Sequence, residues 1–338
     1  MSAETLPAPQ APPAAPRVLP YHRLYRAQPD YRWWRPLVAV AVAAGAILVT
    51  NVSLTLMLLP PLIAEHGVQA LADPSLLARA AQLDTGAPLN LLILLGSIAL
   101  WSPCVLLGLM AAGIRPIGLV HSVEGRIRWR WLLACLWPAA VVVAVSVLGG
   151  SVAVPVLLGE RLDAPSTPPV TLLLSLLVIV LVVPLQSAAE EYVFRGLLMQ
   201  TLGSWIAFPL VALIVPTALF TFGHLYDIWG LIDVALFGLV SAWLAWRTGG
   251  LEAGIALHTM NNVILMSLLA TGALGGTAVG TETGGPLALL PNLVMEAAYV
   301  LLVLWQGKRM RLATTALAPA LPAPAAPGPR PGGAGGPA

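Results

Sequence analysis

The sequence predicts an all-α, polytopic transmembrane helical bundle of about eight spans that encloses a polar cavity. Hydrophobic residues make up 58% of the 338-residue chain, charged residues make up 9%, and the mean hydropathy is +0.85. This composition is more apolar than a soluble domain can bury. Both cysteines, Cys104 and Cys135, fall in apolar segments without a CxxC spacing. We therefore expect neither a disulfide framework nor a thiolate metal site.

Apolar runs long enough to cross about 30 Å of hydrocarbon as helices define the spans. They cover residues 37–60, 88–114, 131–157, 169–186 with a continuation to 202, 205–223, 231–246, 253–270 and 288–306. The fourth run is unusual because a charged motif interrupts it before it continues as an apolar segment.

The composition divides the chain into five segments. These are a Pro/Ala-rich and then basic-aromatic cytosolic tail at 1–35, three N-terminal spans at 36–168, a polar transmembrane core at 169–271, a loop and last span at 272–312, and a Pro/Ala/Gly-rich tail at 313–338. Trp33, Trp34 and Arg35 suit an anchor at the lipid headgroups. The last segment has few bulky apolar side chains, so we expect it to be disordered.

The distribution of arginine predicts the orientation of the spans. Basic residues gather before the first span, between the second and third, and after the last, whereas the loops at 61–87 and 158–168 hold one arginine each. Because cytosolic loops carry the excess of Lys and Arg, we expect both termini in the cytosol, which requires an even number of spans. No secretory signal is recognisable. We expect an integral protein of a bacterial plasma membrane.

Polar side chains are concentrated between residues 169 and 271. An ionisable residue at bilayer depth costs roughly 2.5–3.5 kcal/mol on insertion scales, so each one calls for a reason. The set comprises Glu190, Glu191, Arg195, His224, Asp227, Asp233, Arg247, Glu252, His258, Asn261 and Asn262. The first three spans contain almost none.

The first polar group lies in the stretch AAEEYVFRG. On a helix, Glu191 and Arg195 are one turn apart with the acid on the N-terminal side, so they form a favourable pair. This pairing leaves Glu190 available. The alternative is a solvated helix end in the cytosol, but the sequence continues as the apolar stretch YVFRGLLMQTLG.

Two further groups follow along the chain. FTFGH places Phe220 and His224 on one helix face, and Gly223 permits close approach of another helix. HTMNN places His258 and Asn262 at i and i+4, so both side chains point the same way. Alone, either group is more typical of a hydrogen-bonding clamp between helices than of a catalytic site.

Together the three groups contain the parts of a hydrolytic site. They supply one carboxylate, two imidazoles and one amide from three separate helices. A carboxylate can accept a proton from water and an imidazole can orient that water. An amide and a second imidazole can donate to a developing oxyanion.

The order of the motifs resembles the CPBP intramembrane endopeptidases, an Abi-like family that includes type II CAAX prenyl proteases and bacteriocin-processing proteins. The matching patterns are EExxxR at EEYVFR, FxxxH at FTFGH and HxxxN at HTMNN. The stretch FGLVSAWLAWRTGGLEAGIALH between the second and third motifs also resembles the family. The resemblance covers residues 169–271 and implies a hydrolase that cleaves peptide bonds in the membrane.

The resemblance implies a role for each matching residue. Glu190 would activate water, and His224 would help to position it. His258 and Asn262 would stabilise the oxyanion of peptide cleavage. The residues that would support the site are Glu191, Arg195 and Phe220.

The mode of water activation stays open between two alternatives. Members of the family have been interpreted as glutamic proteases and as metalloenzymes. Glu190, His224 and His258 offer a carboxylate and two imidazoles that could coordinate zinc. Since HExxH is absent, we favour a metal-free enzyme without a cofactor and keep zinc as the alternative.

The substrate is less defined than the chemistry. The resemblance is compatible with prenylated CAAX termini, peptide pheromones, bacteriocins or other bacterial targets. We expect a membrane-associated protein or peptide substrate and contact with the lipid bilayer, and we expect no nucleic acid partner. The sequence indicates no particular oligomeric state.

A rival class of protein would use the same residues differently. In a non-catalytic polytopic protein, such as a transporter or a scaffold, the buried polar side chains would clamp helices together. A serine rhomboid is disfavoured because GxSG is absent. In addition, Ser187, Ser241 and Ser267 have no histidine at a suitable spacing.

The depth of the site residues is a further expectation. With the arginine-derived orientation, Glu190 falls near the inner end of its span and His258 near the inner third of its own. His224 falls nominally toward the outer end of the fifth run. To bring these side chains together requires a bend at a proline of the fourth or fifth span, or a fifth span that begins later than Ile206.

Overall fold

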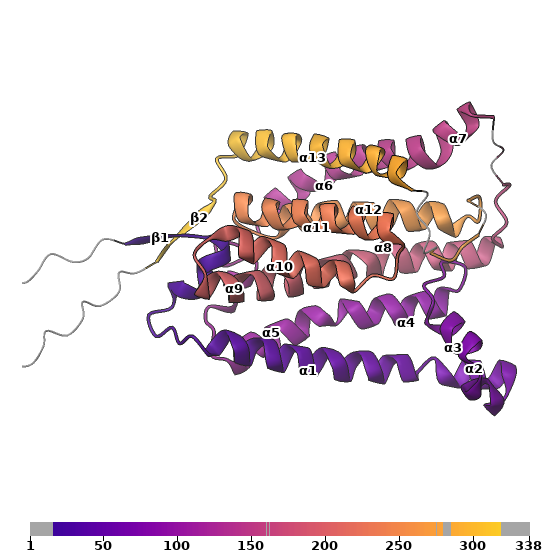
Figure 1. The fold of residues 1–338 in the computed structure, drawn as a ribbon, viewed down its shortest axis with the longest axis horizontal. Coiled ribbons are helices and arrows are strands. Elements are labelled where there is room, and N and C mark those ends of the chain that lie inside the picture. The colour runs from indigo at the N-terminus through magenta and orange to yellow at the C-terminus, as the bar shows by residue number, and fades with distance from the viewer. Residues whose placement is uncertain (1–15, 160, 162, 275, 280–284, 319–338) are drawn as a thin grey trace, which may run out of the picture.

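The computed structural model describes residues 16–159, 161, 163–274, 276–279 and 285–318. Long helices run roughly side by side, with a small two-stranded sheet at one end (Figure 1). The α-helices are α1 (Arg35–Leu56), α2 (Leu59–His66), α3 (Pro74–Ala81), α4 (Pro88–Ala99), α5 (Trp101–Ala111), α6 (Trp129–Leu148), α7 (Val154–Leu157), α8 (Pro169–Glu191), α9 (Met199–Trp205), α10 (Pro209–Phe222), α11 (Ile228–Thr248), α12 (Glu252–Ala270) and α13 (Leu289–Arg309). The shorter elements are strands β1 (Arg17–Pro20) and β2 (Thr315–Ala318), 3-10 helices η1 (Tyr21–Ala27), η2 (Val68–Ala72), η3 (Ile117–Val120) and η6 (Pro286–Ala288), and π-helical segments η4 (Gly149–Ala153) and η5 (Tyr192–Leu198).

Seven helical stretches in the described part of the chain are long and apolar enough to cross a membrane. They are Arg35–His66, Pro88–Ala111, Trp129–Leu157, Pro169–Trp205, Ile228–Thr248, Glu252–Ala270 and Leu289–Arg309. Helix α10 is also apolar but shorter. These stretches coincide with the predicted runs, and the all-α polytopic bundle is confirmed.

The outer surface of the bundle is apolar. Leu173 and Leu181 on α8 are exposed, as are Val141 and Val145 on α6. Such a surface is unfavourable in water but suits lipid tails. Because each helix satisfies its own backbone hydrogen bonds, it can face hydrocarbon without unpaired polar groups.

Helix α12 has a central position, since it packs against α6 on one side and α8 on the other. Helix α4 also packs against α8, α10 packs against α11, and α1 packs against α5. The α1–α5 contact depends on a small residue. A Cβ atom at Gly108 would come within 2.3 Å of the Ala39 carbonyl oxygen, so only glycine permits this approach.

The segment before α1 is folded rather than extended. Tyr21, Leu24 and Tyr25 in η1 are buried, and η1 packs against α9. The approach is close, because a Cβ atom at Gly203 would lie 2.0 Å from the His22 carbonyl oxygen.

Strands β1 and β2 bring the two described ends of the chain together. They pair antiparallel, with Arg17 opposite Ala318 and Pro20 opposite Thr315. The prediction of disorder for 313–338 is therefore wrong at 315–318, because β1 supplies a partner strand that composition does not reveal. Residues 319–338 lie outside the described residues. Both described ends lie at one end of the bundle (Figure 1), as an even number of crossings requires, and the cytosolic assignment of that end stays a prediction.

Candidate active site

The helix that carries the glutamate pair does not end at the pair. Helix α8 includes Pro184 and both glutamates, and continues through η5 into α9 as one stretch, Pro169–Trp205. In η5 the helix widens to the π form, which occurs mostly as short insertions and often at functional sites. Glu190 and Glu191 therefore lie inside a long helix, where their surroundings are set by neighbouring helices.

Glu191 and Arg195 form the predicted pair. Arg195 Nη1 donates to Glu191 Oε1 at 2.8 Å, and both side chains are fully buried. Arg195 Nη2 also donates to the Gly238 carbonyl oxygen of α11 at 2.9 Å. The guanidinium carbon lies 4.5 Å from the centre of the Phe220 ring on α10. One arginine thus connects three helical elements, which confirms the pairing expected from the EExxxR spacing.

His258 of α12 lies between the two carboxylates. Its Nε2 is 3.3 Å from Glu190 Oε2, and its Nδ1 is 3.2 Å from Glu191 Oε1. His258 thus places one imidazole within reach of both carboxylates of the glutamate pair.

His224 contacts Phe220, whose ring also lies close to His258. The Nδ1 atom of His224 lies 2.9 Å from the Phe220 carbonyl oxygen. A carbonyl oxygen can only accept a hydrogen bond, so Nδ1 is the donor and carries a proton. In the neutral ring, Nε2 therefore keeps a lone pair. The Phe220 ring centre is 4.8 Å from that of His224 and 6.0 Å from that of His258. Among the described residues, no hydrogen bond or ion pair joins His224 to Glu190.

Asn262 is connected to α8 by a residue that the sequence analysis missed. Its Nδ2 donates to Gln186 Oε1 at 3.2 Å, and Asn261 Nδ2 donates to Asn262 Oδ1 at 3.2 Å. Gln186 precedes Glu190 by one helical turn, so the i−4 spacing is the signal that could have identified it. The structure thus brings Asn262 beside the glutamate helix but not into a direct bond with Glu190.

The course of the chain brings the fifth predicted run back beside the glutamate helix. The fourth stretch extends to Trp205, the chain turns at 206–208, and α10 packs back on α9 and η5. Glu190 and His224 lie at equal sequence distances from this turn, so the returning helix brings His224 level with Glu190. The sequence analysis required a bend at a proline of the fourth or fifth span, or a fifth span that begins later than Ile206. Helix α10 begins at Pro209, so the last of these expectations is confirmed.

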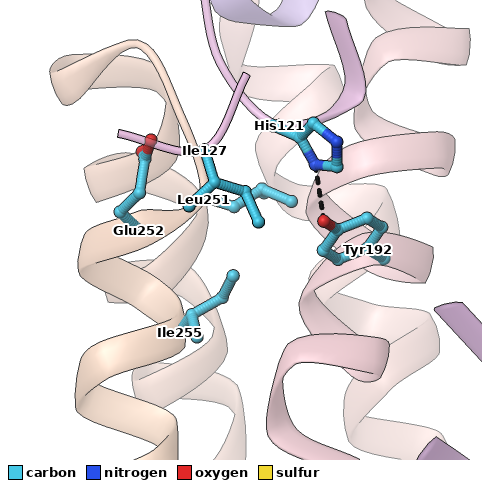
Figure 2. Close-up of a pocket in the computed structure, with 6 residues that line it drawn as sticks. All are labelled: His121, Ile127, Tyr192, Leu251, Glu252 and Ile255. Carbon is cyan, nitrogen blue, oxygen red and sulfur yellow. Dashed lines mark hydrogen bonds between the residues drawn. The ribbon is translucent and has the colours of Figure 1, made fainter. Parts of the chain in front are cut away.

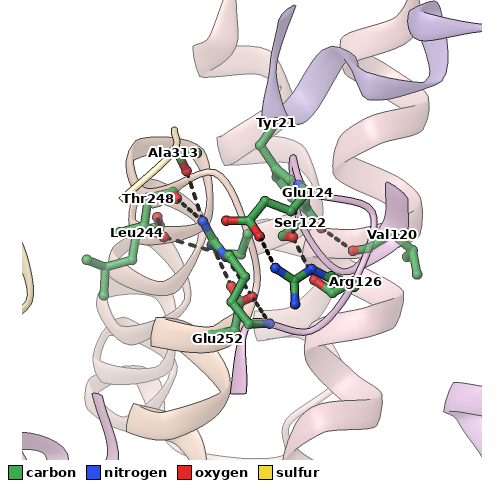
Figure 3. A network of polar contacts seen from close by, with 11 residues as sticks. Tyr21, Val120, Ser122, Glu124, Arg126, Leu244, Thr248, Glu252 and Ala313 are labelled. Atoms are coloured by element: carbon green, nitrogen blue, oxygen red, sulfur yellow. Dashed lines mark hydrogen bonds and ion pairs between the residues drawn. The ribbon is translucent and has the colours of Figure 1, made fainter. Parts of the chain in front are cut away.

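Glu252, a buried carboxylate at the start of α12, lies outside this cluster. Arg128 Nη2 donates to Glu252 Oε2 at 2.7 Å and Arg128 Nε donates to Glu252 Oε1 at 2.9 Å. Arg128 Nη1 donates to the carbonyl oxygens of Thr248 and Ala313 at 3.1 and 2.9 Å. The network ties the loop before α6 to α11, α12 and the C-terminal segment (Figure 3).

A small cavity of about 10 Å³ lies beside the glutamate helix (Figure 2). Its lining residues are His121, Ile127, Tyr192, Leu251, Glu252 and Ile255. Tyr192 follows Glu191 directly, and its hydroxyl is hydrogen-bonded to His121 Nδ1. None of the four predicted catalytic residues lines this cavity, so we assign it no part in the chemistry.

The zinc alternative has a geometric requirement. Three or more His, Cys, Asp or Glu side chains must converge on one point. In the part of the chain that the structure describes, no such group is arranged to hold a metal ion.

Comparisons with known proteins point to the same segment as the motifs. The family model for type II CAAX prenyl endopeptidase, Rce1-like, matches residues 169–264. The uncharacterized protein YyaK of Bacillus subtilis (strain 168) is 32% identical over 92 residues, which are 25% of this chain and 31% of that protein. The match thus spans about a third of that curated relative. No solved structure matches the chain. All three motifs lie within 169–264, so the resemblance to intramembrane CAAX-type endopeptidases is confirmed for this segment.

Proposed function

We propose that this protein is an intramembrane endopeptidase that hydrolyses a peptide bond of a membrane-associated substrate with water activated by Glu190. The observation that carries the proposal is the difference between two adjacent glutamates. Glu191 is fully buried and paired with Arg195. Glu190 keeps some exposure, and its one ion-pair partner among the described residues is the His258 imidazole. The match of 169–264 to the Rce1-like family model supports this assignment.

The reaction follows from the donors and acceptors of the site. Glu190 takes a proton from a water molecule, whose oxygen attacks the carbonyl carbon of the scissile peptide. The carbonyl oxygen becomes an oxyanion, toward which His258 and Asn262 can donate. The proton then passes to the amide nitrogen, the C–N bond breaks, and an amine and a carboxylic acid leave.

His224 has a positioning role in this scheme. With its Nδ1 committed to the Phe220 carbonyl, the ring keeps Nε2 for a water molecule. Glu191 and Arg195 hold His258 and the α10–α11 pair in place. We infer a CAAX-type or leader-bearing peptide as the substrate class, by likeness to the matched family.

The experiment that tests the proposal compares membrane-associated peptides from cells that contain the wild type, Glu190→Gln or Glu296→Gln. Glu296 is a buried glutamate of α13, so its variant is a matched loss of one carboxylate outside the site. We expect a defined set of peptides to lose its cleaved forms with Glu190→Gln and to keep them with Glu296→Gln. Unchanged cleavage in both, in folded and inserted protein, would favour the non-catalytic clamp.

The mechanism needs a separate measurement. Elemental analysis of the purified protein, followed by an assay with the identified peptide in the presence of a chelator, distinguishes the glutamic from the zinc-dependent form. We expect less than stoichiometric zinc and full activity with the chelator. Stoichiometric zinc with loss of activity on chelation would replace the metal-free mechanism and leave the peptidase proposal intact.

A further inference from the structure

A cationic groove lies between α11 and α13 at the end of the bundle where the two described chain ends meet. Its volume is about 180 Å³. Arg247 from the last turn of α11, Lys308 from the last turn of α13 and Arg311 just after α13 contribute to its lining. Three cationic side chains, from the end of α11 and from the end of α13 and the turn after it, therefore line one groove.

The described part of the protein does not neutralise these cations. Within the described residues, no carboxylate forms an ion pair with any of the three, and the sequence contains no acidic residue after Glu296. The neighbouring Arg309 differs, because its guanidinium lies 4.2 Å from the centre of the Trp305 ring. Three unpaired positive charges at one hollow attract an anion.

The floor of the same groove is apolar. Val303 is fully buried, and Leu304 and Leu312 are partly buried. A free inorganic anion gains nothing from such a surface, whereas a ligand with a charged head and a hydrocarbon tail can contact both parts.

The groove lies at the depth of the lipid headgroups. Exposed tryptophans mark this end of the bundle, namely Trp33 and Trp34 before α1, Trp129 at the start of α6 and Trp305 near the end of α13. Tryptophan is enriched at membrane–water interfaces. Basic pockets between transmembrane helices at this level bind the headgroups of anionic lipids.

The backbone at Arg311 adds a further observation. Its φ angle is 53°, in the left-handed region that a residue with a Cβ atom seldom adopts. The Arg311 N–H donates to the Lys308 carbonyl and the Leu312 N–H donates to the Gly307 carbonyl, which fixes this turn. These two bonds form the Schellman motif that ends α13, which accounts for the left-handed angle of Arg311.

We propose that this groove binds the phosphate of an anionic membrane lipid, with Arg247, Lys308 and Arg311 around the phosphate and an acyl chain along Leu304. The charge complementarity selects a phosphate ligand, and the apolar floor selects a lipid over free phosphate. The proposal does not depend on the peptidase reaction, because none of these residues belongs to the catalytic cluster.

The test uses the full chain in a neutral detergent and compares two triple variants. One removes the groove charges (Arg247→Gln, Lys308→Gln and Arg311→Gln), and the other removes three exposed arginines at the same end (Arg32→Gln, Arg115→Gln and Arg130→Gln). Binding of phosphatidylglycerol is measured by native mass spectrometry and by the thermal shift. Phosphatidylcholine with the same chains and inorganic phosphate are the comparison ligands.

We expect the groove variant to bind phosphatidylglycerol roughly 100-fold more weakly than the wild type, and each single variant roughly fivefold more weakly. The control variant should change the affinity less than about threefold. Equal weakening in both triple variants would show diffuse surface attraction and overturn the site. Equal binding of phosphatidylcholine, or inorganic phosphate binding as tightly as the lipid, would overturn the anionic lipid as its ligand. If the groove triple variant does not fold, the single variants decide the question.

Discussion

Two buried carboxylates differ in how completely they are bonded. They are Glu252, at the start of α12, and Glu190, on the neighbouring helix α8. Both oxygens of Glu252 accept hydrogen bonds from Arg128, which also donates to two carbonyl oxygens (Figure 3). Among the described residues, Glu190 has one ion-pair partner, His258 Nε2 at 3.3 Å, and its side chain is 11% exposed. A saturated carboxylate stabilises the junction of several segments, whereas an unsaturated one keeps lone pairs for water.

Glu191 is hydrogen-bonded less completely than Glu252 and more completely than Glu190. Its Oε1 accepts a hydrogen bond from Arg195 Nη1 and lies 3.2 Å from His258 Nδ1. Its Oε2 is buried with no hydrogen-bond partner among the described residues. This oxygen lies where a side chain at Gly254 would be, since a Cβ atom there would come within 2.9 Å of it. Two adjacent carboxylates on one helix thus share the contact with His258 but have different surroundings, because Arg195 one turn along the helix pairs with Glu191.

The largest expected effect is on catalysis. Glu190→Gln should lower the rate of peptide cleavage by about 100- to 10,000-fold, the range for loss of a general base. Since glutamine can still bond to His258, the free energy of unfolding should change by less than about 1 kcal/mol. Initial rates on a peptide identified in cells and thermal unfolding in detergent measure the two effects. A large loss of stability with unchanged specific activity would assign Glu190 to the structural class of Glu252.

The Arg128–Glu252 pair should show the opposite behaviour. Arg128→Met leaves a buried carboxylate unpaired, which should destabilise the protein by about 3–5 kcal/mol. The double variant Arg128→Met with Glu252→Leu should recover more than half of that loss, because the uncompensated charge is gone. The measurement is the unfolding midpoint of each variant in the same detergent. If the double variant is as unstable as the single one, the hydrogen bonds to Thr248 and Ala313 are the stabilising part.

Adjacent asparagines permit a sharper comparison inside the site. Asn262→Ala removes the amide that we assign to the oxyanion, and should lower kcat by about 100- to 1,000-fold. Asn261→Ala removes only a donor to Asn262 and should lower kcat less than about threefold. Equal losses in the two variants would mean that Asn262 acts through helix packing.

The smallest expected effect is on the pH dependence of stability. Burial lowers the pKa of His121, against the opposing influence of Glu252, and burial also lowers the pKa of His22. The unfolded chain therefore binds protons on these rings more readily than the folded chain. Their contribution is complete above pH of about 6.5 and is lost as the pH falls toward the lowered pKa values.

Thermal unfolding between pH 8 and pH 5 tests this expectation. The double variant His22→Asn with His121→Asn should show a smaller drop of the midpoint toward pH 5 than the wild type. The exposed His66 provides the control substitution, His66→Asn, which should keep the wild-type slope. A slope that is unchanged in the double variant would assign the acid sensitivity to other groups.

Much of the candidate site could be predicted from local spacing. A four-residue separation on a helix is enough to pair Glu191 with Arg195 and to stack Phe220 with His224. Gln186 could have been found by the same rule but was missed. The partner of Glu252 could not be found this way, because Arg128 lies 124 residues earlier, and nothing local to either residue specifies the other.

The sequence by itself determined the membrane spans, the polar positions within them and the pairs one helical turn apart. These features depend on the composition and periodicity of short segments, which each helix expresses without its neighbours. Only the tertiary structure decided that His224 lies level with Glu190, that His258 lies between two carboxylates, and that β2 pairs with β1. These contacts depend on where the chain turns at 206–208 and on how α8, α10 and α12 pack, and such distances are fixed by the whole bundle rather than by any one segment.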